Sequence, residues 1–242
     1  MPQRKAGSQD RSRTFFPSRA PGKKPLARVV DGALDDRLVG HARRAIARLG
    51  TRGLRQSYFT TFWLGRGEKP ANAIEEAVRS LWSIAAPGRR CAGAEWWIGR
   101  SYTNAVPVGF HFDQDVRAPR GLRHPLVSSV FFFNRVRGGH LAVTDQRAGR
   151  PSGAPIPLQP SVLQAVAPRR NRYAIFDGRL FHGVLDARGR TPGARLAAPR
   201  GRLRVTLVVN FWTRRPTAVP RWRDGHAYLA LGGARAVTLE GT

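Results

Sequence analysis

The segment RLRVTLVVNFW, residues 202–212, decides the fold class because polar and apolar side chains alternate along it. Side chains two residues apart point to the same face of a β-strand, so strict alternation is typical of a strand with one face in the core. The sequence therefore predicts a strand with two chemically different faces. The apolar face carries Leu203, Val205, Leu207, Val209 and Phe211. The other face carries Arg202, Arg204, Thr206, Val208 and Asn210.

Short β-prone segments precede this strand, and clusters of Gly, Pro, Asn or Asp separate them. Together with 202–212 they make about eight strands after a helical region, an order that favours an α+β fold or a β core with a helical buttress. Eight antiparallel strands commonly close as a jelly roll or double-stranded β-helix, a cupin-like barrel. The segments are 94–103, 108–114, 127–134, 139–144, 161–166, 172–176 and 180–185.

The first third of the chain supplies the expected helical support. Apolar residues recur at helical spacing in 35–50 and again in 71–85, and 56–65 is aromatic and β-prone. We expect a basic, flexible tail and then one domain, with two surface insertions. The boundaries are 1–25 for the tail, 26–242 for the domain, 26–90 for its support, 94–212 for its β core, 213–242 for a C-terminal extension, and 147–160 and 187–201 for the insertions.

Composition restricts the partners and the location. The formal net charge is +27, from 42 Lys and Arg against 15 Asp and Glu, but nearly all the positive charge is arginine spread along the chain. Such a chain attracts polyanions, and we expect nonspecific rather than specific nucleic-acid binding. A single cysteine, Cys91, excludes an internal disulfide and a multi-cysteine zinc site. No long apolar run and no secretory signal pattern is present, so we expect a cytoplasmic protein that does not enter membranes.

The segment VGFHFDQDV, residues 108–116, contains candidate metal ligands. His111 and Asp113 would share a strand face, and Asp115 would continue it. This pattern fits a metal site and equally a strand whose polar face meets water. His182, on a later predicted strand, is the third candidate ligand, and we expect it to face His111 across the mouth of the barrel. Two histidines and one carboxylate suit Fe(II) as a facial triad, and a catalytic zinc site is the alternative.

The polar face of 202–212 offers a carboxylate anchor. Arg204 can bind a carboxylate with its guanidinium fork, and Thr206 can add a hydrogen bond. Arg202, on the same face, is a competing anchor, and we prefer Arg204 because Thr206 completes the pair. The alternative interpretation of this face is a solvated edge strand.

Taken together, His111-x-Asp113, His182 and Arg204-x-Thr206 resemble the iron(II)/2-oxoglutarate-dependent dioxygenase superfamily, and 95–212 is most similar to its prolyl-4-hydroxylase-like branch. The resemblance implies a double-stranded β-helix. It also implies that His111, Asp113 and His182 bind iron, and that Arg204, Thr206 and Tyr102 bind 2-oxoglutarate. Two features depart from the branch. Arg204 stands where lysine is usual, and the insertion ARGRTPGARLAAPRG lengthens the chain before it.

The activity that this resemblance implies is hydroxylation coupled to decarboxylation of 2-oxoglutarate to succinate, with dioxygen as cosubstrate and ascorbate as a stimulant. Related halogenases lack the carboxylate ligand, so Asp113 favours hydroxylation or a variant such as desaturation. The expected substrate is a small molecule or an amino-acid side chain of a peptide or protein. Candidate substrate-binding residues are Arg100, Asp115 and His140. Two alternatives stay open at this point, a nucleic-acid-modifying oxygenase and a non-catalytic cupin-type barrel.

Overall fold

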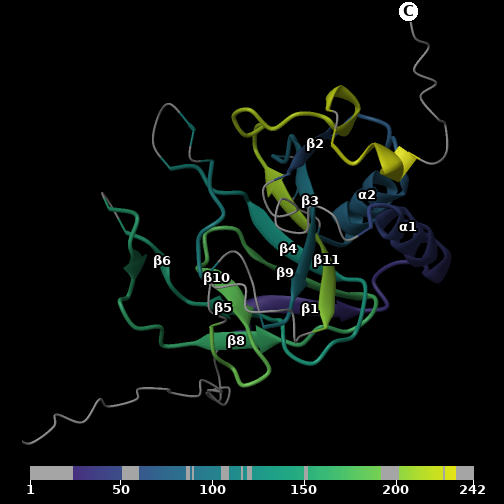
Figure 1. Cartoon of the computed structure of the whole chain (residues 1–242). Helices are drawn as coiled ribbons and strands as arrows, with labels where there is room; N and C mark the ends of the chain where they lie inside the picture. Colours follow the sequence, from purple (N-terminus) through teal and green to yellow (C-terminus); the bar gives the residue numbers. More distant parts are fainter. Residues whose placement is uncertain are drawn as a thin grey trace, which may run out of the picture.

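The computed structural model describes residues 24–50, 60–85, 88, 90–104, 109–115, 117–118, 122–149, 152–191, 202–225 and 227–232. These residues form a helical layer, a large sheet and a small sheet (Figure 1). Residues 1–23 of the predicted tail and most of the predicted insertion 187–201 lie outside the described residues. None of the helices in the described part of the chain has the length and apolar character needed to cross a membrane.

The large sheet has six strands in the order β1-β9-β4-β11-β3-β2, and every neighbouring pair is antiparallel. Strand β11 lies inside this sheet and pairs with β3 on one side and β4 on the other. The two faces of β11 are therefore fixed by two neighbours at once. The strands are β1 (Ala27–Asp31), β9 (Arg172–Asp177), β4 (Val127–Phe132), β11 (Leu203–Trp212), β3 (Gly93–Tyr102) and β2 (Phe62–Gly65).

The small sheet has the strand order β10-β5-β8 and packs against one face of the large sheet. Its strands are β10 (His182–Leu185), β5 (His140–Thr144) and β8 (Leu163–Val166). A buried apolar cluster fills the space between the sheets, with Val130 and Phe132 from β4, Val143 from β5 and Phe176 from β9. A separate hairpin of β6 (Arg147–Ala148) and β7 (Pro155–Ile156) projects from this end of the molecule (Figure 1).

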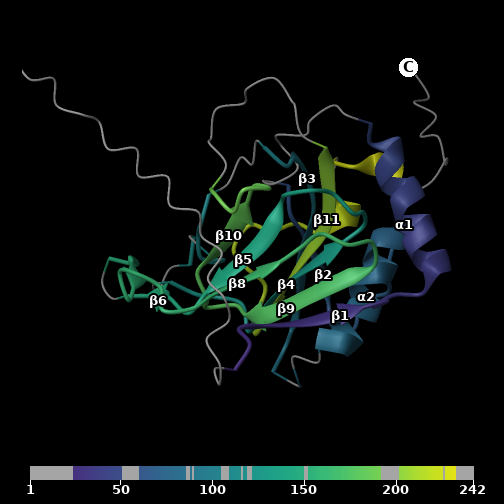
Figure 2. The ribbon, with the colours of Figure 1, turned by 90° about the horizontal axis from the view of Figure 1, so that it is seen from below.

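The helices α1 (Asp36–Arg48) and α2 (Ala73–Ala85) cover the opposite face of the large sheet (Figure 2). Both begin at a side-chain cap, which satisfies backbone N–H groups that have no partner inside the helix. The Asp35 carboxylate accepts from the N–H groups of Arg37 and Leu38, and the Asn72 side-chain oxygen does the same for two residues of α2. Between helices and sheet lies the second, larger apolar cluster.

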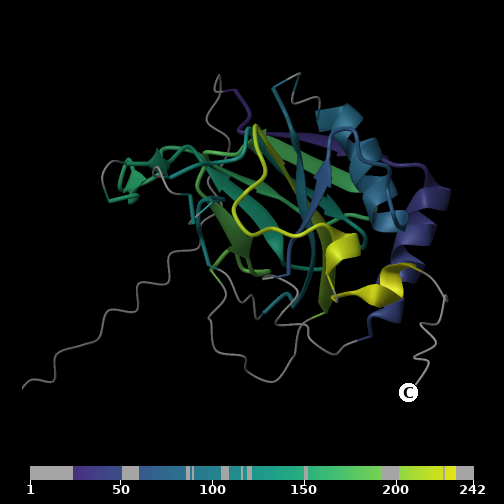
Figure 3. The same ribbon diagram turned by 90° about the horizontal axis from the view of Figure 1, so that it is seen from above.

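After β11 the chain returns over the helical side through the 3₁₀ turns η2 (Trp222–Asp224) and η3 (Leu229–Gly232) (Figure 3). Leu231 of η3 belongs to the apolar cluster beneath the helices. The described part of the predicted C-terminal extension therefore lies over the helical layer. It does not lie over the space between the two sheets.

Most predicted elements are confirmed, with boundaries that differ by a few residues. The prediction of a continuous strand at 108–114 is wrong. Within 109–115, only His111 pairs with another strand, through an isolated bridge to His182. Just after the candidate ligands the chain bends away, because the Asp115 N–H donates to the Arg123 carbonyl. The predicted insertion 147–160 contains the β6–β7 hairpin, and β1 was not predicted at all.

Candidate metal centre

Backbone pairing brings the two candidate histidines side by side. The His111 N–H donates to the His182 carbonyl at 2.8 Å, and the His182 N–H donates to the His111 carbonyl at 3.0 Å. The two rings lie 4.5 Å apart between centroids. The expectation that these residues face each other across a barrel mouth is therefore wrong, because they are direct cross-strand neighbours. Gly183 permits the approach, since a Cβ atom there would lie 2.6 Å from the Phe110 ring.

Asp113 completes a compact group with these histidines. One carboxylate oxygen of Asp113 lies 3.6 Å from His111 Nε2, and the other lies 3.4 Å from His182 Nε2. One ligand atom from each residue lies within 4.8 Å of the others. His182 and Asp113 are buried, whereas the His111 side chain keeps 39% of its surface exposed. The group is thus open to solvent on the His111 side.

The hydrogen bonds around the group orient its donor atoms toward one point. The Nδ1 of His111 bonds to the Gly109 carbonyl at 2.9 Å, and the Nδ1 of His182 bonds to the Leu180 carbonyl at 2.9 Å. A carbonyl can only accept, so each Nδ1 carries a proton, and each Nε2, which faces Asp113 in the metal-free protein, becomes a lone-pair donor when it is deprotonated and a metal binds. The Ser128 hydroxyl donates to Asp113 at 2.7 Å and fixes the carboxylate. Two neutral imidazoles and one carboxylate fit Fe(II) in a facial arrangement.

The surroundings of these three side chains shift their pKa values, and the ionised form of Asp113 favours binding of a cation. Burial raises the pKa of Asp113, but the charge of His182 and the hydrogen bonds from His111 and Ser128 outweigh burial and hold that pKa well below its usual value. Burial lowers the pKa of His182, despite the charge of Asp113. For His111, burial opposes protonation, but hydrogen bonding and charge from Asp113 raise its pKa. An ionised carboxylate between imidazoles is the donor set that a divalent metal requires.

The predicted anchor residues lie on the face of β11 that looks toward this group. Arg204 and Thr206 are buried, and a guanidinium nitrogen of Arg204 donates to the Thr206 hydroxyl at 3.5 Å. The Arg204 guanidinium also lies 5.2 Å from the centre of the Phe132 ring. Gly139 makes room for this side chain, because a Cβ atom there would lie 2.7 Å from Arg204 Cδ and its φ is +68°. Only glycine combines that conformation with that approach.

Arg202, Arg100 and Tyr102 do not share the position of the anchor residue Arg204. Arg202 is exposed and precedes β11, whereas Arg204 is buried within it. Arg100 and Tyr102 share the other face of β3, because Arg204 pairs with Ser101 between them. Arg100 donates to the Gly50 carbonyl at 2.5 Å and lies over the Tyr228 ring on the helical side. The structure does not bring Arg100 or Tyr102 to the metal group.

Asp115 and His140, two of the predicted substrate-binding residues, interact with groups other than the metal ligands. The Asp115 carboxylate binds the Arg123 guanidinium and accepts from Thr217 N at 3.0 Å, so it ties two loops together. His140 begins β5 beside Gly139. Burial lowers the pKa of His140, and the nearby charge of Arg204 lowers it further.

Sequence reasoning missed residues that support the site. Ser128 bonds to Asp113, and the Nδ1 of His124 bonds to the Asp113 carbonyl at 2.7 Å. Glu95 lies on the same face of β3 as Ser101, and burial, opposed by a Thr61 hydrogen bond but reinforced by the charge of Asp113, raises the pKa of Glu95 to about 7. A single serine or glutamate in a strand does not indicate from the sequence that it supports a metal site, because its partner lies on a distant strand.

No protein-family model and no curated protein matches this chain. Among solved structures, the chain is similar to a prolyl-4-hydroxylase from Pseudomonas putida, at 18% identity and a TM-score of 0.46 over 78% of this chain and 89% of that one. It is also similar to a Trichoplax adhaerens prolyl hydroxylase in complex with a hypoxia inducible factor peptide, at 13% and 0.45 over 78% and 84%. A third is HygX from Streptomyces hygroscopicus with nickel and 2-oxoglutarate bound, at 12% and 0.48 over 82% and 85%. The solved structures to which this chain is similar thus include two prolyl hydroxylases and a protein with nickel and 2-oxoglutarate bound.

Proposed function

We propose that this protein is an Fe(II)/2-oxoglutarate-dependent oxygenase that hydroxylates a small molecule or an amino-acid side chain of a peptide or protein. One observation carries the proposal. His182 lies against the Phe176 ring and Arg204 lies over the Phe132 ring, and both rings belong to the apolar cluster between the two sheets. A buried guanidinium on that face can bind the carboxylate of an organic-acid cosubstrate beside the metal.

Each residue has a distinct part in this proposal. His111, Asp113 and His182 hold the metal, and Ser128 keeps the Asp113 carboxylate in place. Arg204 and Thr206 bind the far carboxylate of 2-oxoglutarate and so set the direction in which it enters. Bound Fe(II), 2-oxoglutarate and dioxygen would together supply the oxidation, with release of succinate and carbon dioxide. The exposed side of His111 leaves a path for the substrate.

A finer proposal concerns the architecture. The six-stranded and three-stranded sheets enclose one apolar cluster, with the metal group and Arg204 at its margin. We propose that they are the two halves of a double-stranded β-helix. The His111–His182 bridge supports this arrangement, because it extends the small sheet by one residue of the segment 109–115.

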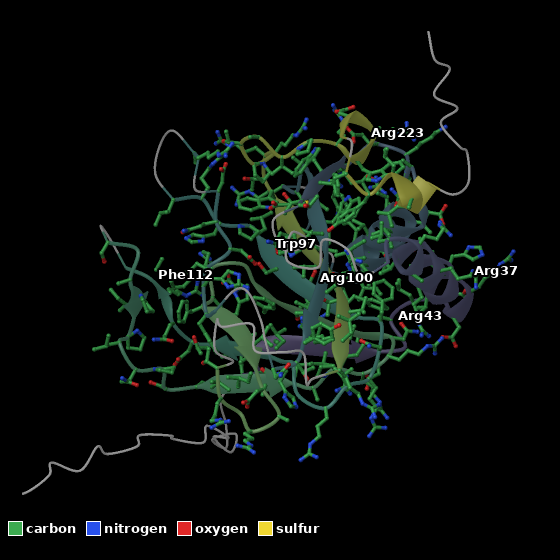
Figure 4. All side chains as sticks on the ribbon, viewed as in Figure 1. Arg37, Arg43, Trp97, Arg100, Phe112 and Arg223 are labelled. Atoms are coloured by element: carbon green, nitrogen blue, oxygen red, sulfur yellow. The ribbon has the colours of Figure 1, made fainter. Side chains whose placement is uncertain are left out.

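The two alternatives make different demands on the site. A non-catalytic cupin-type barrel would bind metal through the same three ligands but does not require 2-oxoglutarate to bind at Arg204. A nucleic-acid oxygenase would direct a basic surface toward the metal. Arg37 and Arg43 of α1 are exposed on the helical side of the large sheet (Figure 4), whereas Arg117 and Arg179 are exposed within a few residues of the candidate ligands in sequence. The positions of the arginines therefore do not separate this alternative from the first proposal.

The test measures binding and turnover separately. Anaerobic protein with Fe(II) is titrated with 2-oxoglutarate by calorimetry, and succinate formation is then followed after dioxygen and ascorbate are added. We expect 2-oxoglutarate binding that His111→Ala abolishes together with metal binding, and that Arg204→Ala weakens while metal binding persists. Metal binding without any 2-oxoglutarate binding would refute the oxygenase and leave the cupin-type alternative.

A further inference from the structure

A row of polar side chains crosses the large sheet at the level of the metal group. Ser128 of β4 pairs directly with Asn210 of β11, and Asn210 pairs directly with Glu95 of β3. Directly paired residues project from the same face of a sheet, with Cβ atoms about 5 Å apart. Ser128 is the residue that donates to Asp113. The row therefore begins at a metal ligand and extends away from it over two strands, to Trp63 of β2, which pairs with Glu95.

The middle member of the row has an unused hydrogen-bonding atom. Asn210 is 1% exposed, and its side-chain oxygen has no hydrogen-bond partner in the part of the chain that the structure describes. An unpaired buried polar group is unfavourable, so such groups are retained where another role requires them. Arg204 and Thr206 are buried polar residues on the same face of β11, and the proposed function assigns both to binding of the cosubstrate. Asn210 is the third buried polar residue of this face.

The outer member of the row is a carboxyl group with remaining capacity. One Glu95 oxygen accepts from the Trp212 indole N–H at 3.1 Å, and the Thr61 side chain also hydrogen-bonds to Glu95. A carboxylate has about four acceptor sites, so others stay available. Trp97, labelled in Figure 4, follows Glu95 by two residues on the same face of β3, and both side chains are partly exposed. A carboxylate, an amide oxygen and an indole face together attract hydrogen-bond donors that carry positive charge.

The charge of this face contrasts with that of the protein. The chain has only 15 acidic residues against 42 basic ones. The charges of Asp113 and Asp115 both act on Glu95. Asp115 is paired with Arg123 and Asp113 is a candidate metal ligand, so Glu95 is the acid of these three that is left to bind a cation.

We propose that Asn210 and Glu95 bind a positively charged amine or guanidinium of the substrate, so that the protein oxidises a cationic substrate. This inference rests on the proposed function and names the substrate class of the same site. In this arrangement the positive charge lies beside Glu95. Asn210, which is nearer to the metal group, accepts a hydrogen bond from the same substrate. The carbon next to that end would then lie beside the metal ligands.

The test compares cationic probes with neutral analogues of similar shape. Protein with Fe(II) and 2-oxoglutarate, kept anaerobic, is titrated by calorimetry with L-lysine and L-norleucine, and with L-arginine and L-citrulline. Each residue is used free and at the centre of an Ala-Gly pentapeptide. We expect the cationic member of each pair to bind about tenfold or more tightly. Glu95→Gln keeps an acceptor for Trp212 but should remove most of that preference. Glu76→Gln, the same change at an exposed position of α2, should leave it intact.

Asn210→Leu separates recognition from folding. Leucine removes an unpaired buried amide, so the melting temperature should stay the same or rise, while binding of the cationic probes weakens about fivefold or more. Equal binding of charged and neutral probes, binding of neither, or tighter binding of a neutral polyol such as maltose would overturn the inference. Binding of 2-oxoglutarate in the same samples shows whether the oxygenase proposal itself holds, because it does not depend on the probe.

Discussion

His111 and His182 exchange both of their backbone hydrogen bonds, and this pairing fixes the geometry of the metal group. In an antiparallel pair of this kind the two side chains leave the backbone on the same side. The segment 109–115 is otherwise without strand pairing, so a single residue pair positions His111. His111 is thus held in position by backbone hydrogen bonds, as His182 in β10 is, although its own segment is irregular.

Ser128→Ala should weaken metal binding without unfolding the protein. The hydroxyl is a hydrogen-bond donor to Asp113, and loss of such a support typically reduces metal affinity by about 10- to 100-fold. Titration with Co(II) would measure the change. Ser129→Ala is the matched control, because Ser129 points to the helical side and bonds to Tyr173 and the Val209 carbonyl. It should lower the free energy of unfolding and leave metal affinity unchanged, and the reverse pattern would contradict the assignment.

Arg204→Lys should weaken 2-oxoglutarate binding about tenfold or more, because an ammonium cannot offer the bidentate fork of a guanidinium. Arg202→Ala should change nothing, since Arg202 is exposed and lies before β11. Calorimetric titration of both variants decides between the two arginines. A loss of binding in Arg202→Ala alone would identify Arg202 as the anchor instead.

Gly139→Ala should impair the anchor as well as the fold. The new Cβ atom would meet Arg204 Cδ at 2.7 Å and Thr103 Cγ2 at 3.2 Å. Gly153→Ala is a matched control with a similar φ of +71°, where the nearest atom is Leu122 Cδ1 at 3.4 Å. Each variant should lose about 1–2 kcal/mol for the left-handed conformation. Thermal unfolding measures that cost, and only Gly139→Ala should also lose affinity for 2-oxoglutarate.

Glu95 should make the metal-free protein less stable as the pH rises. Its pKa is raised from an ordinary 4.5 to about 7, so the folded state binds a proton more tightly than the unfolded state. Stability from this group is full below about pH 4.5 and is lost as the pH rises to about 7. Urea unfolding of wild type and Glu95→Gln between about pH 5 and pH 8 isolates this contribution. A difference between the two proteins that does not change with pH would refute the raised pKa.

The sequence predicted the elements and both faces of β11 because alternation is a local property. It predicted Leu207 and Val209 in a core and Arg204 and Thr206 on the opposite face, and the structure agrees. It also placed Arg100 and Tyr102 on one face of β3. Which face that is depends on the register with β11, and a shift of one residue would exchange the faces. Sequence alone could not choose between them.

The grouping of the candidate ligands was predictable, whereas their surroundings were not. The structure brings His111, Asp113 and His182 together, although the segment that carries His111-x-Asp113 is not a strand as predicted. Ser128 and Glu95 lie far from these residues in sequence and reach the site only through pairing of β4, β11 and β3. Such non-local contacts have no signature in one sequence.

Nearly every position of strand β11 contributes either to packing or to the proposed site. One face packs beneath the helices through Leu207, Val209 and Phe211, while the other carries the anchor pair and Asn210. Both edges are paired, so proline is excluded along most of its length. A library of all single substitutions should therefore show its lowest tolerance at 203–212. Laboratory evolution of new substrates would then have to proceed through the loops, with β11 kept almost unchanged.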